Sequence, residues 1–134
     1  MRRTSLPVAF LAFFLCVAFS VVAGLLILHG SDDQRHHVTV LGKRIQLTAN
    51  ESFGHEVFAT HCAVCHTLAA SNSVGATGPN LDSLHPSKKV IKVIVPVGVT
   101  GPAGTMPAGL VAGPELSAVA DYVSHVANPK AGKP

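Results

Sequence analysis

The segment Cys62-Ala63-Val64-Cys65-His66 carries residue types and a spacing that predict a specific chemistry. On one helical turn, thiols at positions i and i+3 share a face, so each can add to one of the two vinyl groups of a haem. The next residue is then held under the iron, and a neutral imidazole is a good iron ligand. The segment therefore predicts one covalent c-type haem, attached through Cys62 and Cys65 and ligated by His66.

The Cys-x-x-Cys spacing also occurs in redox-active dithiols and in zinc sites. A thioredoxin-like dithiol should lie beside a βαβ pattern, and an all-cysteine zinc site needs a second cysteine pair. The third cysteine, Cys16, instead lies in an apolar run. The chain has eight histidines, but no pair of them follows at zinc-finger spacing. We therefore favour the haem.

An electron-transfer haem needs a second axial ligand, and methionine commonly accompanies histidine in this role. The chain has two methionines, Met1 at its start and Met106 in a Gly/Pro-rich stretch after the histidine. Elimination predicts Met106 as the second iron ligand. A methionine that fills a gap in the core is the ordinary alternative. His85 and His125 are the reserve ligands.

Residues 7–29 form an uncharged, apolar segment that is long enough to cross a bilayer, for which about 20 residues suffice. The apolar region of a cleaved signal peptide is shorter, about 7–15 residues. Small-residue cleavage sites exist after Ser20 and Ala23, but apolar sequence would then continue to Leu28. We favour a retained transmembrane anchor over a cleaved signal.

Charge on the two sides of this segment predicts its orientation. Arg2 and Arg3 precede it, whereas Asp32 and Asp33 follow it closely. Basic residues tend to stay on the cytoplasmic side. Residues 1–6 are therefore expected in the cytoplasm, and the haem-binding part on the outer, periplasmic side of the cytoplasmic membrane.

The net charge of +3 belongs to the ends of the chain. Residues 51–127 hold three basic and five acidic residues, so the part that carries the haem motif is mildly acidic. This balance argues against nucleic-acid binding, which requires a basic surface.

Residues 30–49 are predicted to form a linker. Apolar residues alternate around Gly42, which is compatible with a short hairpin, and a flexible spacer explains the segment equally well. A domain of residues 50–127 follows. Its first helix should begin near Asn50, because Thr48 and Glu51 have the spacing of a capping box.

The rest of the domain alternates between loops and helices. Pro114 and Glu115 favour the start of a final helix, whose apolar stripe ends before Asn128-Pro129. The remaining predictions are a loop over 67–86, a helix over 87–95 that ends at Pro96 and could also be a strand, a loop over 97–113 and a flexible tail over 128–134.

Several motifs resemble class I cytochromes c, in the same order along the chain. They are Gly54-x-x-x-Phe58, Cys62 to His66, Gly78-Pro79-Asn80-Leu81, Met106-Pro107 and Ala120-Asp121-Tyr122-Val123. The resemblance covers residues 50–127. It implies an all-α fold around the haem, preceded here by one transmembrane helix.

The resemblance also implies roles for single residues. Gly54 would allow the first and last helices to cross closely, and Phe58 and Tyr122 would pack at the crossing. The Pro79 carbonyl would accept the ring proton of His66 and orient it. The chain has no tryptophan, and Gly109 stands where many relatives have an aromatic residue, so the partners of the haem propionates stay unassigned.

Together these features predict a membrane-anchored electron carrier and not an enzyme. The expected partners are redox proteins of the membrane, such as a quinol-oxidising complex and a terminal oxidase, with no nucleic acid and no small-molecule substrate. The alternatives are a haem subunit of a larger respiratory oxidoreductase and a ligand-binding or peroxidatic haem in which Met106 stays off the iron. The haem is expected to complete the core, because a segment this short with few aromatic residues builds a thin one.

Overall fold

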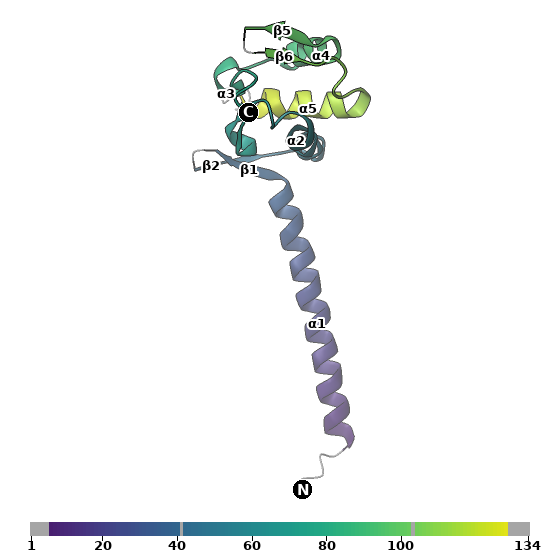
Figure 1. Ribbon diagram of the computed structural model, residues 1–134. Coiled ribbons are helices and arrows are strands. Elements are labelled where there is room, and N and C mark those ends of the chain that lie inside the picture. Colours follow the sequence, from purple (N-terminus) through teal and green to yellow (C-terminus); the bar gives the residue numbers. More distant parts are fainter. Residues whose placement is uncertain (1–5, 41, 103, 129–134) are drawn as a thin grey trace. The chain divides into compact units, whose positions relative to one another are not determined.

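A computed structural model describes residues 6–40, 42–102 and 104–128 (Figure 1). The chain divides into two compact units at the boundary between Arg35 and His36. The first unit is helix α1, and the second contains the cysteines and histidine of the haem motif. Each unit is described by itself below.

Helix α1, Leu6–Arg35, contains an apolar stretch, Phe10–Leu28, that is long enough to cross a membrane. Its large apolar side chains are exposed, as those of a lipid-facing helix would be. The helix runs beyond the predicted segment 7–29, because the residues that follow include no proline to interrupt its hydrogen bonds. A signal sequence has the same features, so this helix alone supports the predicted anchor only weakly. Residues 1–5 of the predicted cytoplasmic segment lie outside the described residues.

Part of the predicted linker forms a hairpin that belongs to the second unit, whereas residues 30–35 continue α1. Strands β1, His37–Val40, and β2, Lys43–Gln46, pair in antiparallel register. Val38 and Leu47 are buried in the core of this unit, and the Leu47 amide donates to the His36 carbonyl at 2.6 Å. Of the two interpretations of residues 30–49, the hairpin is correct for 37–40 and 43–46, because Val38 and the following Leu47 pack in the core.

The first and last helices of the second unit confirm their sequence signals. Helix α2, Ala49–His61, begins with the predicted capping box, in which the Glu51 amide donates to Thr48 Oγ1 at 3.2 Å and the Thr48 amide to Glu51 Oε2 at 2.7 Å. Helix α5, Gly113–Val126, has Pro114 in its first turn. At the start of α2, the capping box accepts hydrogen bonds from backbone amides that have no partner within the helix. At the start of α5, Pro114 has no amide hydrogen that would need a partner.

Helices α2 and α5 cross at very close range. A β-carbon on Gly54 would overlap the Ala118 carbonyl and would lie 2.9 Å from Tyr122 Cβ, so only glycine fits there. The rings of Phe58 and Tyr122, both fully buried, pack beside it with centroids 6.2 Å apart. The Tyr122 hydroxyl shares a 2.8 Å hydrogen bond with Ser71, and burial raises the pKa of Tyr122 to about 12. This crossing is the centre of the core.

The expectation of a purely helical domain is only partly right. The segments predicted as loops contain a short helix, a 3₁₀ turn and two further antiparallel strand pairs. Strands of two or three residues are too short to show an alternating pattern in the sequence. These elements are β3 (Thr67–Leu68), η1 (Ala69–Ser71), β4 (Ser73–Val74), α3 (Leu81–Leu84), β5 (Val99–Gly101) and β6 (Gly104–Met106).

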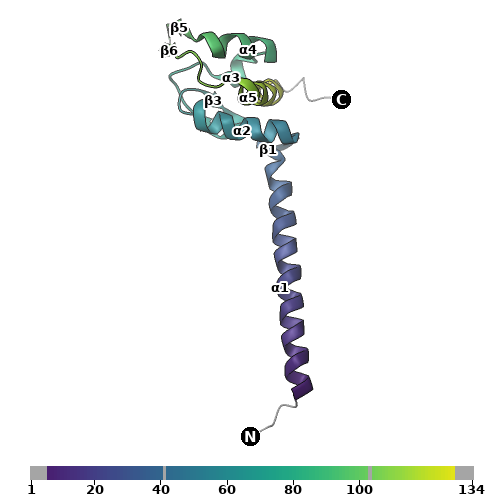
Figure 2. The ribbon, with the colours of Figure 1, turned by 90° about the vertical axis from the view of Figure 1, so that its right-hand side faces the viewer.

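Helix α4, Lys88–Val97, confirms the helical interpretation of this stretch and its predicted N-cap, Ser87. Pro96 does not end the helix but lies in its last turn. Gly98 ends it instead, with a φ of +69° and its amide donating to the Ile94 carbonyl at 2.8 Å. Both ribbon views place α5 between α2 and α4 (Figures 1 and 2). Of the predicted tail, Asn128 is described and residues 129–134 lie outside the described residues.

The hairpin offers a direct test of where the domain begins. Replacing Leu47 by Ala in the haem-loaded chain should lower the free energy of unfolding by about 2–5 kcal/mol, because a buried leucine would leave a cavity. Thr39→Ala, on an exposed position of the same hairpin, is the matched control and should change it by under about 0.5 kcal/mol. Denaturant titration measures both. Equal, small effects would show that the hairpin is a mere spacer.

Candidate cofactor site

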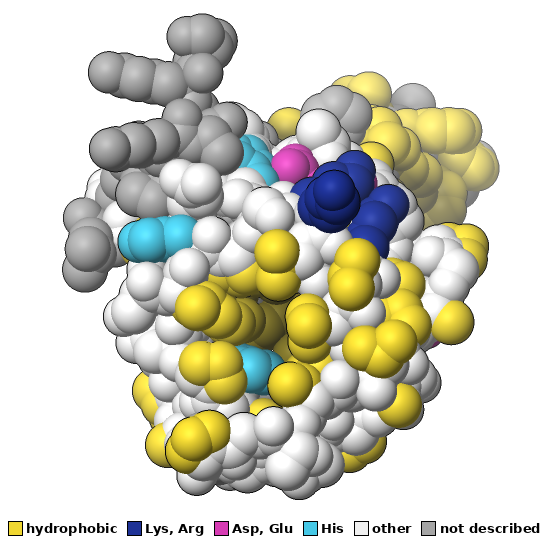
Figure 3. Space-filling model, turned by 90° about the horizontal axis from the view of Figure 1, so that it is seen from above, with side chains coloured by type: hydrophobic (Ala, Val, Ile, Leu, Met, Phe, Trp, Pro, Cys, Tyr) yellow, Lys and Arg dark blue, Asp and Glu magenta, His cyan; other side chains and the backbone are white. Residues whose placement is uncertain are grey.

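An apolar cavity of about 590 Å³ lies in the second unit. Figure 3 shows its mouth as a hollow ringed by hydrophobic side chains, with a histidine inside it and basic side chains gathered nearby. The described residues that line it include no Lys, Arg, Asp or Glu side chain. The cavity therefore suits a large and mainly apolar group.

The end of α2 brings both cysteines and His66 to this cavity. The amides of Cys65 and His66 both donate to the Cys62 carbonyl, at 3.1 and 3.0 Å, which folds the segment into a tight turn. Cys62, Cys65 and His66 all line the cavity. Burial, and secondarily the nearby Cys65, raises the pKa of the Cys62 thiol to about 11. Both thiols are free, as attachment to a haem requires.

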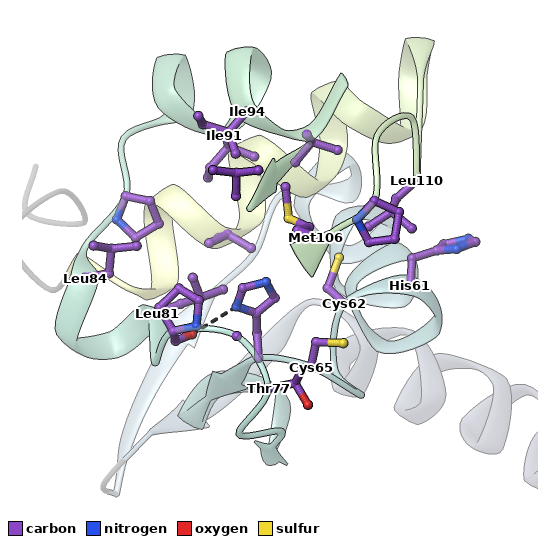
Figure 4. Close-up of a pocket in the computed structure, with 18 of the residues that line it drawn as sticks. His61, Cys62, Cys65, Thr77, Leu81, Leu84, Ile91, Ile94, Met106 and Leu110 are labelled. Carbon is purple, nitrogen blue, oxygen red and sulfur yellow. Dashed lines mark hydrogen bonds between the residues drawn. The ribbon is translucent and has the colours of Figure 1, made fainter. Parts of the chain in front are cut away.

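The His66 ring is held in one orientation. Its Nδ1–H donates to the Pro79 carbonyl at 2.9 Å, the bond drawn as a dashed line in Figure 4. Because that carbonyl can only accept, Nε2 is left with a lone pair for a metal. A β-carbon on Gly78 would lie 2.5 Å from Cε1 of the ring and 2.7 Å from Nδ1. The backbone of Gly78 thus fills the space beside the imidazole.

Met106 reaches the same cavity from a different part of the chain. It ends strand β6, where it pairs with Val99 of β5, and its side chain lines the cavity. In the view of Figure 4, Met106 lies between Cys62 and the α4 residues Ile91 and Ile94. A β-carbon on Gly98 would lie 2.7 Å from the Met106 carbonyl oxygen. Glycine at this position therefore lets the residue before β5 pack closely against the end of β6.

The two reserve ligands do not line the cavity. His85 Nδ1 hydrogen-bonds the Ala127 carbonyl, and His125 Nδ1 lies 2.9 Å from Glu51 Oε1, within ion-pair distance although off the line of a hydrogen bond. The structure therefore brings together Cys62, Cys65, His66, Pro79 and Met106 and leaves His85 and His125 elsewhere. The described residues also offer no cluster of three or more His, Cys, Asp and Glu side chains for a metal ion, which gives a zinc site no support.

These residues fit a covalent haem. Two thiols lie beside the His66 imidazole, and the surrounding wall is apolar. Nε2 of this ring is free for a metal because Nδ1 donates to the Pro79 carbonyl. Sequence reasoning missed part of that wall, namely the apolar face of α4, which contributes Val90, Ile91, Ile94 and Val95. The helical spacing of these residues was the available signal, but a strand explained it equally well.

Gly78 provides a test of this geometry. In Gly78→Ala, the added methyl group should displace the His66 ring and break its bond to Pro79, destabilising the haem-loaded protein by about 1–3 kcal/mol. The haem absorption spectrum should change with it. Gly24→Ala is the control, since a β-carbon there meets nothing within 4 Å and Gly24 does not line the cavity. An unchanged spectrum and stability in Gly78→Ala would contradict the described packing.

Comparisons with known proteins bear on the family of this chain. No family model and no curated protein matches the chain. Among solved structures, the chain is similar to the c-type cytochrome SorU from Sinorhizobium meliloti, with 42% sequence identity and a TM-score of 0.51. The match covers 58% of this chain and 91% of SorU. With this identity over nearly all of a solved relative, and with two thiols and a histidine around a haem-sized apolar cavity, the chain belongs to the c-type cytochromes.

Proposed function

We propose that this protein is a membrane-anchored, monohaem, class I cytochrome that carries single electrons between redox complexes at the outer face of the cytoplasmic membrane. The observation that carries the proposal is the convergence of His66 and Met106, from distant parts of the chain, on the one apolar cavity that also holds Cys62 and Cys65. A histidine and a thioether occupy both axial positions of an electron-transfer haem.

Each site residue then has a defined task. Cys62 and Cys65 would hold the haem covalently, and His66 Nε2 and Met106 Sδ would bind its iron. Pro79 orients the imidazole through its carbonyl. Haem supplies a one-electron iron couple when bound. Met106 favours the ferrous state, so we expect a higher potential than two histidine ligands would give.

The cavity wall supports electron transfer over bond-making chemistry. Apart from the attachment and ligand residues, its described lining is mainly aliphatic side chains and prolines, which exclude water but transfer no protons. Apart from His61, Thr77 and Thr105, this lining presents no acid, base or nucleophile to a substrate. We therefore propose a carrier and not an enzyme.

Helix α1 supports the membrane part of the proposal. Its apolar stretch, Phe10–Leu28, lies between Arg2 and Arg3 on one side and acidic residues on the other. An anchor so oriented would keep the haem domain on the periplasmic side. There it would exchange electrons with a quinol-oxidising complex and a terminal oxidase.

The mature protein should then keep its first residues. Mass spectrometry of the purified protein should find Arg2 to Leu28, and the protein should sediment with membranes after a carbonate wash. A mature N-terminus at Val21 or Gly24, in a soluble fraction, would show that α1 is a cleaved signal. The haem site would be unaffected by that result.

Two other functions compete with this one. A ligand-binding or peroxidatic haem is the second candidate, because Met106 lies on a short, mainly exposed hairpin from which its sulfur could be displaced. A fixed haem subunit of a larger oxidoreductase is the third. Co-purification in mild detergent separates the subunit from the shuttle, and ligand binding separates the second candidate.

Met106→Ala decides whether the methionine is a ligand. The variant should bind carbon monoxide readily when reduced, whereas the parent binds it weakly, and its midpoint potential should fall because a ligand that favours ferrous iron is lost. Val74→Ala, at an exposed apolar residue that does not line the cavity, is the control and should keep the parent's potential. Spectroscopic redox titration measures these changes. Avid binding by the parent would favour the ligand-binding function.

A further inference from the structure

One carboxylate of α5 joins the two sides of the haem cavity. Asp121 Oδ2 accepts a hydrogen bond from Asn50 Nδ2 of α2 at 2.9 Å, and Oδ1 forms an ion pair with Lys88 Nζ of α4. The Asp121 side chain is 25% exposed and that of Lys88 is 48% exposed. The two carboxylate oxygens of Asp121 thus bind α2 and α4, which belong to different walls of the cavity.

The two helices carry different ligands. Helix α2 runs directly into the turn that holds Cys62 and His66. Helix α4 runs through Gly98 into the β5–β6 hairpin, where Val99 pairs with Met106. The far side of this hairpin is also tied to α4, because the Gly109 amide donates to the Val95 carbonyl at 3.1 Å. The position of α4 therefore determines the position of the methionine.

Helix α4 depends on polar contacts more than α2 does. None of its side chains is fully buried, whereas α2 buries Gly54, Val57 and Phe58. Its apolar face lines the haem cavity, and its described polar contacts to α5 are Lys88 with Asp121 and Lys92 Nζ with Ser117 Oγ at 3.0 Å. Loss of one of these contacts should let α4 move more freely than the well-buried α2.

We propose that Asp121 is a positioning residue for Met106, which holds α4 and the attached hairpin at the distance from α2 that places the sulfur on the iron. This inference rests on the proposed role of Met106 as a ligand. Asp121 does not line the cavity, so it would act only through Lys88 and α4. Its loss should weaken ligation by Met106 without removing the haem.

The test uses Asp121→Asn in the full-length, haem-loaded protein, with carbon monoxide as the probe of an open iron position. The affinity of the reduced protein for carbon monoxide should rise about three- to fivefold, the size expected for a partly exposed ion pair. The midpoint potential should fall with it. Lys88→Gln should behave in the same way. Glu115→Gln removes the same charge from an exposed position of α5 and should match the parent.

A second arm separates positioning from general loosening. In the Met106→Ala background, Asp121→Asn should leave the affinity for carbon monoxide unchanged, because there is no sulfur left to position. Raising the salt concentration should shift the affinity of the parent towards that of Asp121→Asn, since salt screens an exposed ion pair. The salt arm needs no variant, so it holds even if Asp121→Asn folds poorly.

Two results would overturn the proposal. In the first, the parent binds carbon monoxide weakly, Asp121→Asn and Lys88→Gln bind it no more tightly than the parent, and salt does not change the affinity. The other is an equal effect of Asp121→Asn with and without Met106. If the parent itself binds carbon monoxide avidly, the proposed function fails first, and this outcome is distinct from both.

Discussion

The close approach of α2 and α5 at Gly54 is the constraint on which the domain depends. Because a β-carbon there would overlap the Ala118 carbonyl, the two backbones can pack almost in contact. Phe58 and Tyr122 then fill the angle beside the crossing. With this angle fixed, the end of α2 presents its cysteines and histidine to the cavity, while the other side of α5 receives α4. Gly54 does not itself line the cavity, yet its close packing against α5 sets the geometry of both walls.

Much of the fold could be predicted because its signals are local. The capping box at Thr48, the proline at the start of α5 and the N-cap at Ser87 each act within one helical turn. The three strand pairs could not be predicted with equal security, since strands of two to four residues gain their pairing from distant contacts. The hairpin of β1 and β2 shows this best, because its alternation has meaning only beside the core that buries Val38 and Leu47.

The same difference between local signals and distant contacts is seen in the site. The spacing of Cys62, Cys65 and His66 predicted attachment directly, and elimination predicted Met106 because no other methionine follows the N-terminal segment. Gly78 was noted only as part of a family motif. Its contact with the His66 ring joins residues from different turns of a loop and leaves no periodic pattern in the sequence. The apolar face of α4 was ambiguous for a related reason, since it lines a cavity whose other walls come from distant parts of the sequence.

The enclosure of the His66 ring has a consequence for how fast electrons could move. The ring has the Gly78 backbone against one side and the Pro79 carbonyl on Nδ1, and its main chain is fixed by the turn after Cys62. A ligand held at three points shifts little when the charge of its metal changes. Small nuclear displacement means a low reorganisation energy, so the barrier to electron exchange would be set by distance and driving force and not by the histidine. Gly78 has no side chain, and the close packing that this allows would in this way affect the rate of electron transfer.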